Sequence, residues 1–178
     1  MQTIKIEKNG ETLIITKSGE ETKGKITEFE GLDEPGEGPP MHVHYKQEER
    51  VRIIKGKMRV RTMEKEFLLT QGEEYTFSPG EAHRFWNEGA ETLHYAGHVM
   101  PAHNYEYFIS HVFRSANEAH DTKPGAFDAA FLLTRYKSEM DILDIPKPVK
   151  MFVFPILLTL GKLTGRFNKF WDAPSPAR

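Results

Sequence analysis

Two short alternating segments joined by a tight turn are the feature that most constrains the fold of this chain. Residues 50–54 and 58–62 each place apolar and basic side chains on opposite sides, and Lys55-Gly56-Lys57 separates them. A period of two is typical of β-strands with one buried face. Further short runs with β-forming residues lie at 2–6, 13–16, 25–29, 73–77, 83–87 and 92–99. The first hundred residues therefore predict an antiparallel sandwich or barrel.

Beyond Pro101 the spacing of the apolar residues becomes helical. The pattern covers residues 105–113 and 126–140, and a third apolar stripe runs over 149–171 with a kink expected at Pro155. Residues 115–118 (Ser-Ala-Asn-Glu) match a capping box, which predicts a helix start. We therefore expect a β-rich domain at residues 1–101. A helical C-terminal extension at residues 102–178 is expected to pack on it or on a partner subunit.

Composition excludes several classes of protein. With 178 residues, 38% hydrophobic and 28% charged, the chain is predicted to form one globular domain with an appendage, neither disordered nor built of membrane spans. Its net charge of −2 lacks the basic excess of a nucleic-acid binder. The absence of cysteine excludes disulfides, thiolate metal sites and a thiol nucleophile. The first ten residues have no apolar signal segment, so we predict a cytoplasmic location.

Histidines give the first indication of chemistry. His42 and His44 are two residues apart, so in a strand their imidazoles project from the same face. Two carboxylates, Glu48 and Glu49, follow a few residues later, and His83 lies on a later strand-like segment. Three imidazoles and one carboxylate suit a divalent transition metal such as iron, manganese, nickel or zinc.

The same residues resemble the two sequence motifs of the cupin family. The first motif, G-x5-H-x-H-x3,4-E-x6-G, is matched by Gly36, His42, His44, Glu49 and Gly56. Glu49 is preferred to Glu48 because it lies six residues before Gly56. The second motif, G-x5-P-x-G-x2-H-x3-N, is matched by Gly72, Gly80, His83 and Asn87, with Ser78 in place of the proline. The resemblance covers roughly residues 24–100.

The resemblance implies an all-β fold, an antiparallel jelly-roll (cupin) barrel, with the α-helical C-terminal extension appended to it. It also implies one divalent metal ion (Fe, Mn, Ni or Zn) in the barrel mouth, with His42, His44, Glu49 and His83 as ligands. We expect a metal-dependent enzyme, oxygenase-like, acting on a small organic molecule. The alternatives are a non-catalytic binding or sensing module and a metal-dependent isomerase or lyase. Because cupins are commonly dimeric, we also expect a homodimer.

Strand alternation suggests which side chains line the pocket. Phe85 and Asn87 share the face of His83, and His98 on the last strand of the β-rich region is a candidate hydrogen-bond partner of a metal ligand or a proton carrier. Val51, Ile53, Met58 and Val60 are either apolar pocket walls or barrel core. A mostly apolar pocket with one metal favours a small, partly hydrophobic ligand with chelating oxygens.

The helical tail is unusually basic and apolar. Five basic residues and no acidic ones lie between Ile145 and Trp171, and only Thr159 is polar within residues 151–160. That apolar run is too short to span a bilayer. Three interpretations follow for residues 149–171: contact with the barrel or with the second subunit of a dimer, which we favour, a lid over the pocket, and, least favoured, contact with an anionic membrane surface.

Overall fold

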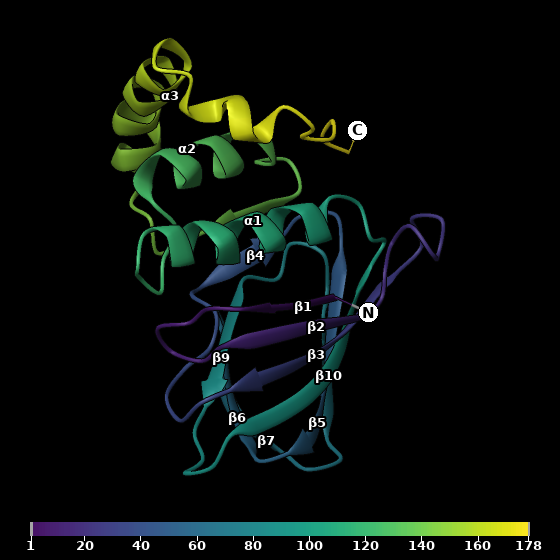
Figure 1. Cartoon of the computed structure of the whole chain (residues 1–178). Helices are drawn as coiled ribbons and strands as arrows, with labels where there is room; N and C mark the ends of the chain where they lie inside the picture. The colour runs from purple at the N-terminus through teal and green to yellow at the C-terminus, as the bar shows by residue number, and fades with distance from the viewer. Residues whose placement is uncertain (1, 178) are drawn as a thin grey trace.

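The computed structural model describes residues 2–177, in which two antiparallel sheets carry a stack of helices at one end (Figure 1). The first sheet has the order β1-β2-β3-β10-β5-β8 and the second the order β11-β4-β9-β6-β7. The strands are β1 (Gln2–Lys5), β2 (Thr12–Lys17), β3 (Thr27–Asp33), β4 (His42–His44), β5 (Glu48–Lys55), β6 (Lys57–Thr62), β7 (Glu66–Thr70), β8 (Glu74–Phe77), β9 (His83–Asn87), β10 (Leu93–Met100) and β11 (Met140–Ile142).

The predicted alternation of β5 and β6 is confirmed. Val51 and Ile53 of β5 are buried, whereas the intervening Arg52 is exposed, and Gly56 makes the turn to β6 with a φ of +98°. A positive φ is readily adopted only by glycine. Inward-facing residues of both sheets form one core, which includes Phe29, Val51, Ile53, Met58, Val60, Phe85, Tyr95 and Val99. Pairing groups the strands into two separate sheets, and closure into a continuous barrel stays a prediction.

One strand inside the predicted β-rich region was not anticipated. β7 has the sequence Glu-Phe-Leu-Leu-Thr, with three consecutive apolar residues and no alternation. It is the edge strand of the five-stranded sheet and pairs only with β6 among the described residues. Because an edge strand has fewer neighbours to bury its side chains, its sequence carries a weak periodic signal.

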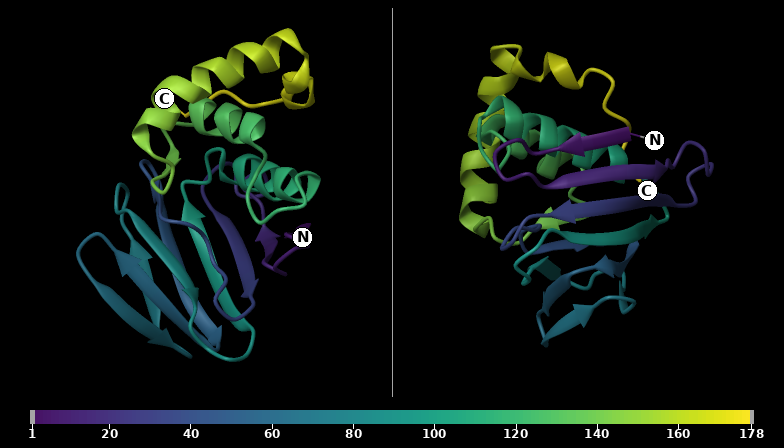
Figure 2. Two further views of the ribbon diagram at one scale, coloured as in Figure 1. Left: turned by 90° about the vertical axis from the view of Figure 1, so that its left-hand side faces the viewer. Right: turned by 60° about the horizontal axis from the view of Figure 1, so that its bottom comes forward.

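The helices stack outward from the sheets in chain order. α1 (Tyr105–Glu118) lies beside the N-terminal hairpin of β1 and β2, α2 (Ala126–Arg135) covers α1, and α3 (Phe154–Leu163) is outermost (Figures 1 and 2). A second core joins them and includes Phe108, Leu132, Tyr136, Met140, Phe154 and Phe170. None of the helices within residues 2–177 is both long enough and apolar enough to cross a bilayer.

The helix predicted over residues 126–140 ends earlier, at Arg135. The chain turns at Tyr136 and then forms β11, which pairs with β4 in the register Met140↔His44 and Ile142↔His42. Tertiary pairing with the edge of β4 therefore overrides the helical pattern. Since β11 belongs to the five-stranded sheet, the extension is integrated with the β-rich region. The division at residue 101 stays a prediction.

The tail is not one kinked helix. A π-helical turn at Val149–Val153 leads directly into α3, and a 3₁₀ turn at Arg166–Phe170 follows. Pro155 lies in the first turn of α3, where its missing N–H is harmless. The chain instead breaks at Gly165, whose φ is +70°. The break follows from glycine adopting a left-handed conformation at a helix end.

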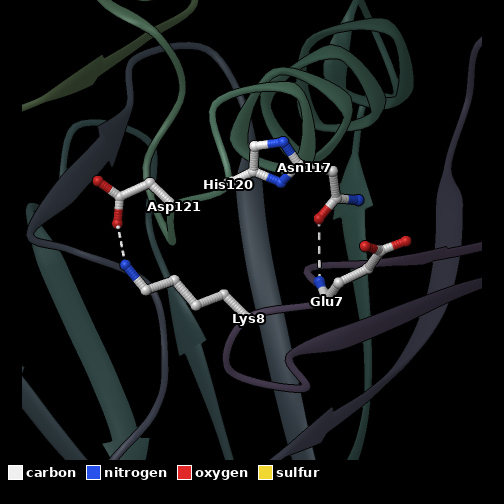
Figure 3. Close-up of a pocket in the computed structure, with 5 residues that line it drawn as sticks. All are labelled: Glu7, Lys8, Asn117, His120 and Asp121. Carbon is white, nitrogen blue, oxygen red and sulfur yellow. Dashed lines mark hydrogen bonds and ion pairs between the residues drawn. The ribbon is translucent and has the colours of Figure 1, made fainter.

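The C-terminal end of α1 is attached to the turn between β1 and β2 (Figure 3). The backbone N–H of Glu7 donates to Asn117 over 2.9 Å, and the ammonium of Lys8 lies 2.9 Å from a carboxylate oxygen of Asp121. The capping-box prediction is thus wrong, because residues 115–118 end α1 rather than starting a helix. Their polar side chains serve contacts with neighbouring segments instead.

Candidate metal centre

Three strands bring the predicted ligand residues to one point. β4 carries His42 and His44, β5 carries Glu49, and β9, which pairs with β4, carries His83 directly opposite His42. The Nε2 atoms of His42, His44 and His83 lie 3.6, 3.2 and 3.1 Å from the same oxygen, Oε2 of Glu49. The four residues therefore surround a common centre.

The strand alternation of β5 separates the two candidate carboxylates. Glu49 is 4% exposed and points to the centre. Glu48 points the other way, where its Oε1 lies 3.5 Å from Nε2 of His98. The structure thus places Glu49, rather than Glu48, among the imidazoles, as expected from the spacing to Gly56.

The second ring nitrogen of each imidazole is held by an oxygen. Nδ1 of His42 donates to the carbonyl of Pro40 over 2.8 Å, and Nδ1 of His83 donates to the carbonyl of Glu81 over 2.9 Å. A carbonyl only accepts, so Nδ1 carries a proton and Nε2 is the ring nitrogen that faces Glu49 and the centre. This is the ring orientation that a metal-binding histidine requires.

Gln47 performs the same task for His44. Its amide nitrogen donates to the carbonyls of Pro101 and Ala102, over 3.0 and 2.9 Å. Its Oε1 is consequently directed at Nδ1 of His44, 3.2 Å away. Gln47 is fully buried, and sequence reasoning missed it because nothing in the spacing reveals a partner across 54 residues. The only signal in the sequence is an amide inside the first motif, between His44 and Glu49.

The electrostatics keep the carboxylate of Glu49 ionised. Burial alone would raise its pKa, but hydrogen bonds with His42, His44 and His83 outweigh burial and hold the pKa well below its usual value. For His83 burial dominates, and with the nearby charge of His42 it lowers the pKa below the ordinary value. Burial opposes protonation of His42 as well, but the hydrogen bond and charge of Glu49 raise its pKa, so a cation that binds here has to displace a proton from His42.

The donor set fits a metal ion. One ligand atom from each of His42, His44 and Glu49 lies within 4.8 Å of the others, so these three residues could hold an ion together. His83 stacks on Phe77 with ring centroids 3.6 Å apart, which fixes its ring behind Glu49. Mixed nitrogen and oxygen ligation suits several divalent transition metals and does not select one.

A cavity of about 500 Å³ opens at the metal centre and continues beneath the helices. Phe29, Phe85 and Tyr95 line it from the sheets, and Tyr105, with its ring 5.9 Å from that of His44, covers it from α1. α1 and α2 supply a further part of the apolar wall, which includes Phe108, Ile109, Val112, Phe113, Leu132 and Leu133. No residue of 149–171 lines the cavity, so the lid interpretation of that segment is wrong and α1 and α2 form the cover.

Of the predicted pocket residues, Phe85 alone lines the cavity. Val51, Ile53, Met58 and Val60 are at most 1% exposed and fill the space between the sheets. Asn87 faces inward but shapes a turn, since its amide donates to the carbonyls of Asp33 and Glu91. His98 faces Glu48 on the other side of β10 from the core. Alternation identifies the inner face of a strand, but not which end of that face meets a cavity.

Glu11 is a cavity residue that the sequence did not reveal. It lies at the turn into β2, and its carboxyl reaches the cavity that His42 also lines. Burial raises the pKa of this carboxyl to about 7, although the nearby side chain of Asn9 opposes the shift. A carboxyl that titrates near neutral pH can donate or accept a proton. A single glutamate in a polar turn gives no signal of this placement.

A family model described as "Cupin domain" matches residues 31–99. Among solved structures, a predicted oxalate decarboxylase from Thermotoga maritima is 18% identical with a TM-score of 0.51, over 56% of this chain and 90% of that chain. A putative sugar phosphate isomerase from Acidithiobacillus ferrooxidans is 24% identical with a TM-score of 0.41, over 43% of this chain. The chain spans about half of that isomerase (50%). No curated protein matches the sequence. At 18% identity the likeness to the decarboxylase structure concerns the fold alone.

Proposed function

Because residues 31–99 of this chain form a cupin domain, we propose that the protein is a metal-dependent cupin enzyme, oxygenase-like, acting on a small organic molecule. We further propose that the two sheets close into a jelly-roll barrel with the metal in its mouth. In this proposal His42, His44, Glu49 and His83 are the ligands, and two coordination positions remain for the substrate or for dioxygen.

The observation that carries the proposal is the convergence of three oriented imidazoles on one carboxylate oxygen. Each Nδ1 is committed to an oxygen of Pro40, Gln47 or Glu81, so each Nε2 is prepared for a metal before any ion arrives. Burying three imidazoles and a carboxylate costs free energy unless each has a hydrogen-bond partner. A cluster that served packing alone would not need this arrangement, whereas a metal site does.

The cavity supports a substrate class. Chelating oxygens, such as those of a hydroxy- or keto-acid, suit the metal end, and an apolar portion suits the aromatic walls beneath α1 and α2. The ion would polarise bound oxygen atoms as a Lewis acid or react with dioxygen. The chain itself supplies Glu11 as a proton donor or acceptor beside His42, and the covering helices exclude water.

The first test is elemental analysis of protein purified without a histidine tag. We expect close to one equivalent of iron, manganese, nickel or zinc, and loss of that metal in His83→Ala. His98→Ala is the matched control, because this histidine lies outside the centre and should leave the metal content unchanged. Wild-type protein that binds no added metal would refute the proposal.

A second candidate function, ligand sensing, is favoured by one observation. The cavity wall includes residues of α1 and α2, the layers on which α3 rests, so a bound ligand touches the helices directly. Oxygen uptake with chelating organic acids separates the candidates. Turnover with loss of dioxygen favours the oxygenase, turnover without it favours an isomerase or lyase, and binding without turnover favours sensing.

A further inference from the structure

The outer surface of α3 and of the π-helical turn before it is apolar and exposed. Five side chains form this surface, here named the outer face: Met151, Phe152, Ile156, Leu160 and Leu163. Phe152 is 64% exposed and Leu163 78%. Continuous apolar surfaces of this kind are rare on monomeric proteins and indicate a site of contact. The outer face is therefore a candidate docking surface.

The inner side of α3 is already occupied. Phe154 and Gly161 are buried against the second core, and Leu157 packs on it. At Gly161 a Cβ atom would come within 2.4 Å of the ring of Phe167, so this glycine allows the following 3₁₀ turn to pack closely. The helix is thus apolar on both sides, and only one side is satisfied within the protein.

Both ends of the α3 segment are attached to the body, so the outer face has a fixed orientation. Before it, β11 is paired with β4. After it, the guanidinium of Arg135 donates to the carbonyls of Ala173 and Pro174, and the N–H of Ala177 donates to Glu139. The views from two sides place α3 as the layer farthest from the sheets (Figures 1 and 2). The outer face is presented away from the cavity.

Unpaired positive charge accompanies the outer face. Lys147, Lys162 and Arg166 are exposed and form no salt bridge with any residue of 2–177, although the guanidinium of Arg166 lies over the ring of Phe127. Lys150 is paired with Asp141, and Lys169 with Glu118 and Asp128. No acidic residue lies between positions 145 and 171. In contrast, residues 1–144 hold 18 basic and 25 acidic side chains, a balance of −7. Residues 145–171 therefore carry a net positive charge, and residues 1–144 a net negative charge.

From these observations we infer that the outer face of α3 docks onto the surface of an anionic lipid bilayer. Apolar side chains with lysines and an arginine at the rim match the acyl boundary and the anionic headgroups of such a surface. A second copy fits less well, because a twofold contact joins the same patch on both copies and would bring two sets of basic residues, Lys147, Lys162 and Arg166, into one interface. The inference is independent of the proposed catalysis.

Co-sedimentation of the full-length protein with vesicles tests the inference. The probes are vesicles of phosphatidylcholine alone and of phosphatidylcholine with phosphatidylglycerol, at low and high salt. We expect binding to the anionic vesicles that weakens with salt. The double variant Phe152→Gln/Leu163→Gln should bind more than tenfold more weakly, because two apolar side chains are lost from the interface. Lys147→Ala and Lys162→Ala should each cost about fivefold.

Matched controls come from the β-rich region. Met63→Gln changes a side chain that is 75% exposed in the turn between β6 and β7, and Lys57→Ala changes an exposed lysine at the start of β6. Both variants should bind anionic vesicles like the wild type. The inference is overturned if the wild type does not co-sediment with anionic vesicles, or if the outer-face variants bind these vesicles as well as the control variants do. A dimer in sedimentation velocity that Phe152→Gln/Leu163→Gln dissociates, without vesicle binding, would identify a second copy as the occupant instead.

Discussion

Gln47 shows how one buried side chain can prepare a metal ligand. Its two amide donors are used by the carbonyls of Pro101 and Ala102, which leaves only its oxygen to face His44. The arrangement selects one tautomer of His44 without any charge. The loop after β10 thereby acts on the candidate metal centre through a neutral contact.

We predict that Gln47→Ala weakens metal binding by about 10- to 100-fold while the fold is retained. The substitution removes the acceptor of His44 Nδ1, so the ring can rotate or change tautomer. Competition with a chelator of known affinity measures the effect, and Gln71→Ala, in the exposed turn between β7 and β8, is the control. Equal affinities in the two variants would show that Gln47 does not orient His44.

Asp33 is a buried carboxyl that the metal centre does not use. It is 0% exposed, and neither side-chain oxygen has a hydrogen-bond partner within residues 2–177. Burial and the charge of Glu11 raise its pKa to about 8, while the Tyr95 hydroxyl opposes the shift. The native state therefore keeps a proton that the unfolded chain releases near pH 4.

From this we predict that the wild type loses stability as the pH rises. Because the folded pKa lies above the unfolded one, the contribution of Asp33 is complete at low pH and disappears as the pH passes through about 8. Its slope is on the order of 1 kcal/mol per pH unit. Asp33→Asn cannot ionise and should remove this slope in urea unfolding between about pH 5 and about pH 7.5. Glu64→Gln is the control and should keep the slope of the wild type. If the free energy of unfolding of Asp33→Asn depends on pH as steeply as that of Glu64→Gln, Asp33 is not the source of the slope.

At the scale of elements, strands with one buried face were predictable; among the edge strands of residues 2–177, β1 and β8 lie in the predicted runs 2–6 and 73–77, whereas β7 and β11 were not predicted. β5, β6 and β9 carry their alternation in the sequence because each is covered on one side by the core. β11 has three residues and depends on the neighbouring edge of β4. A pairing across nearly one hundred residues leaves no local signal, so the helix was extended to Met140 when it ends at Arg135.

The segment between β3 and β4 provides a test at this scale. Gly36 and Gly38 both have positive φ, but only Gly38 is tightly enclosed: a Cβ there would lie 2.3 Å from the carbonyl oxygen of Phe85. At Gly36 a Cβ would meet nothing within 4 Å. Gly36, which matches the first cupin motif, is thus less tightly enclosed than Gly38.

We accordingly predict that Gly38→Ala is more destabilising than Gly36→Ala. Gly36→Ala should lower the free energy of unfolding by roughly 1 kcal/mol, because only the backbone conformation is strained. Gly38→Ala adds a collision between the new Cβ and the backbone of Phe85, so it should lower the free energy of unfolding by about 2 kcal/mol more. Urea unfolding of both variants measures the difference, and equal costs would mean that the segment can move away from β9.

At the scale of the whole molecule, the metal centre joins parts of the chain that are distant in sequence. β4, which bears two of the histidines, lies between β9 and β11, and β11 continues into the helical tail. An ion held by the centre would therefore stabilise the sheet and the helical layers together.

We predict that adding a binding divalent metal raises the unfolding temperature and that the gain fades as the pH falls below about 6.5, because protons compete for the imidazoles. Differential scanning fluorimetry of metal-treated and chelator-treated protein measures the gain. His83→Ala should show a reduced gain at every pH, and His94→Ala, on an outward face beside Glu30, should behave like the wild type. A gain independent of pH would argue against histidine ligation.

The sequence alone determined the strand-rich first hundred residues, the helical tail and the histidines and glutamate of the candidate metal centre. These are local properties, because alternation, helical spacing and motif spacing depend on residues that are close together in the sequence. Only the tertiary structure decided that Gln47 orients His44, that Glu11 reaches the cavity and that α1 and α2 cover it. It also decided that α3 turns an apolar face outward. The physical reason is that such contacts depend on how separate elements pack, and packing partners leave no trace in the spacing of either segment.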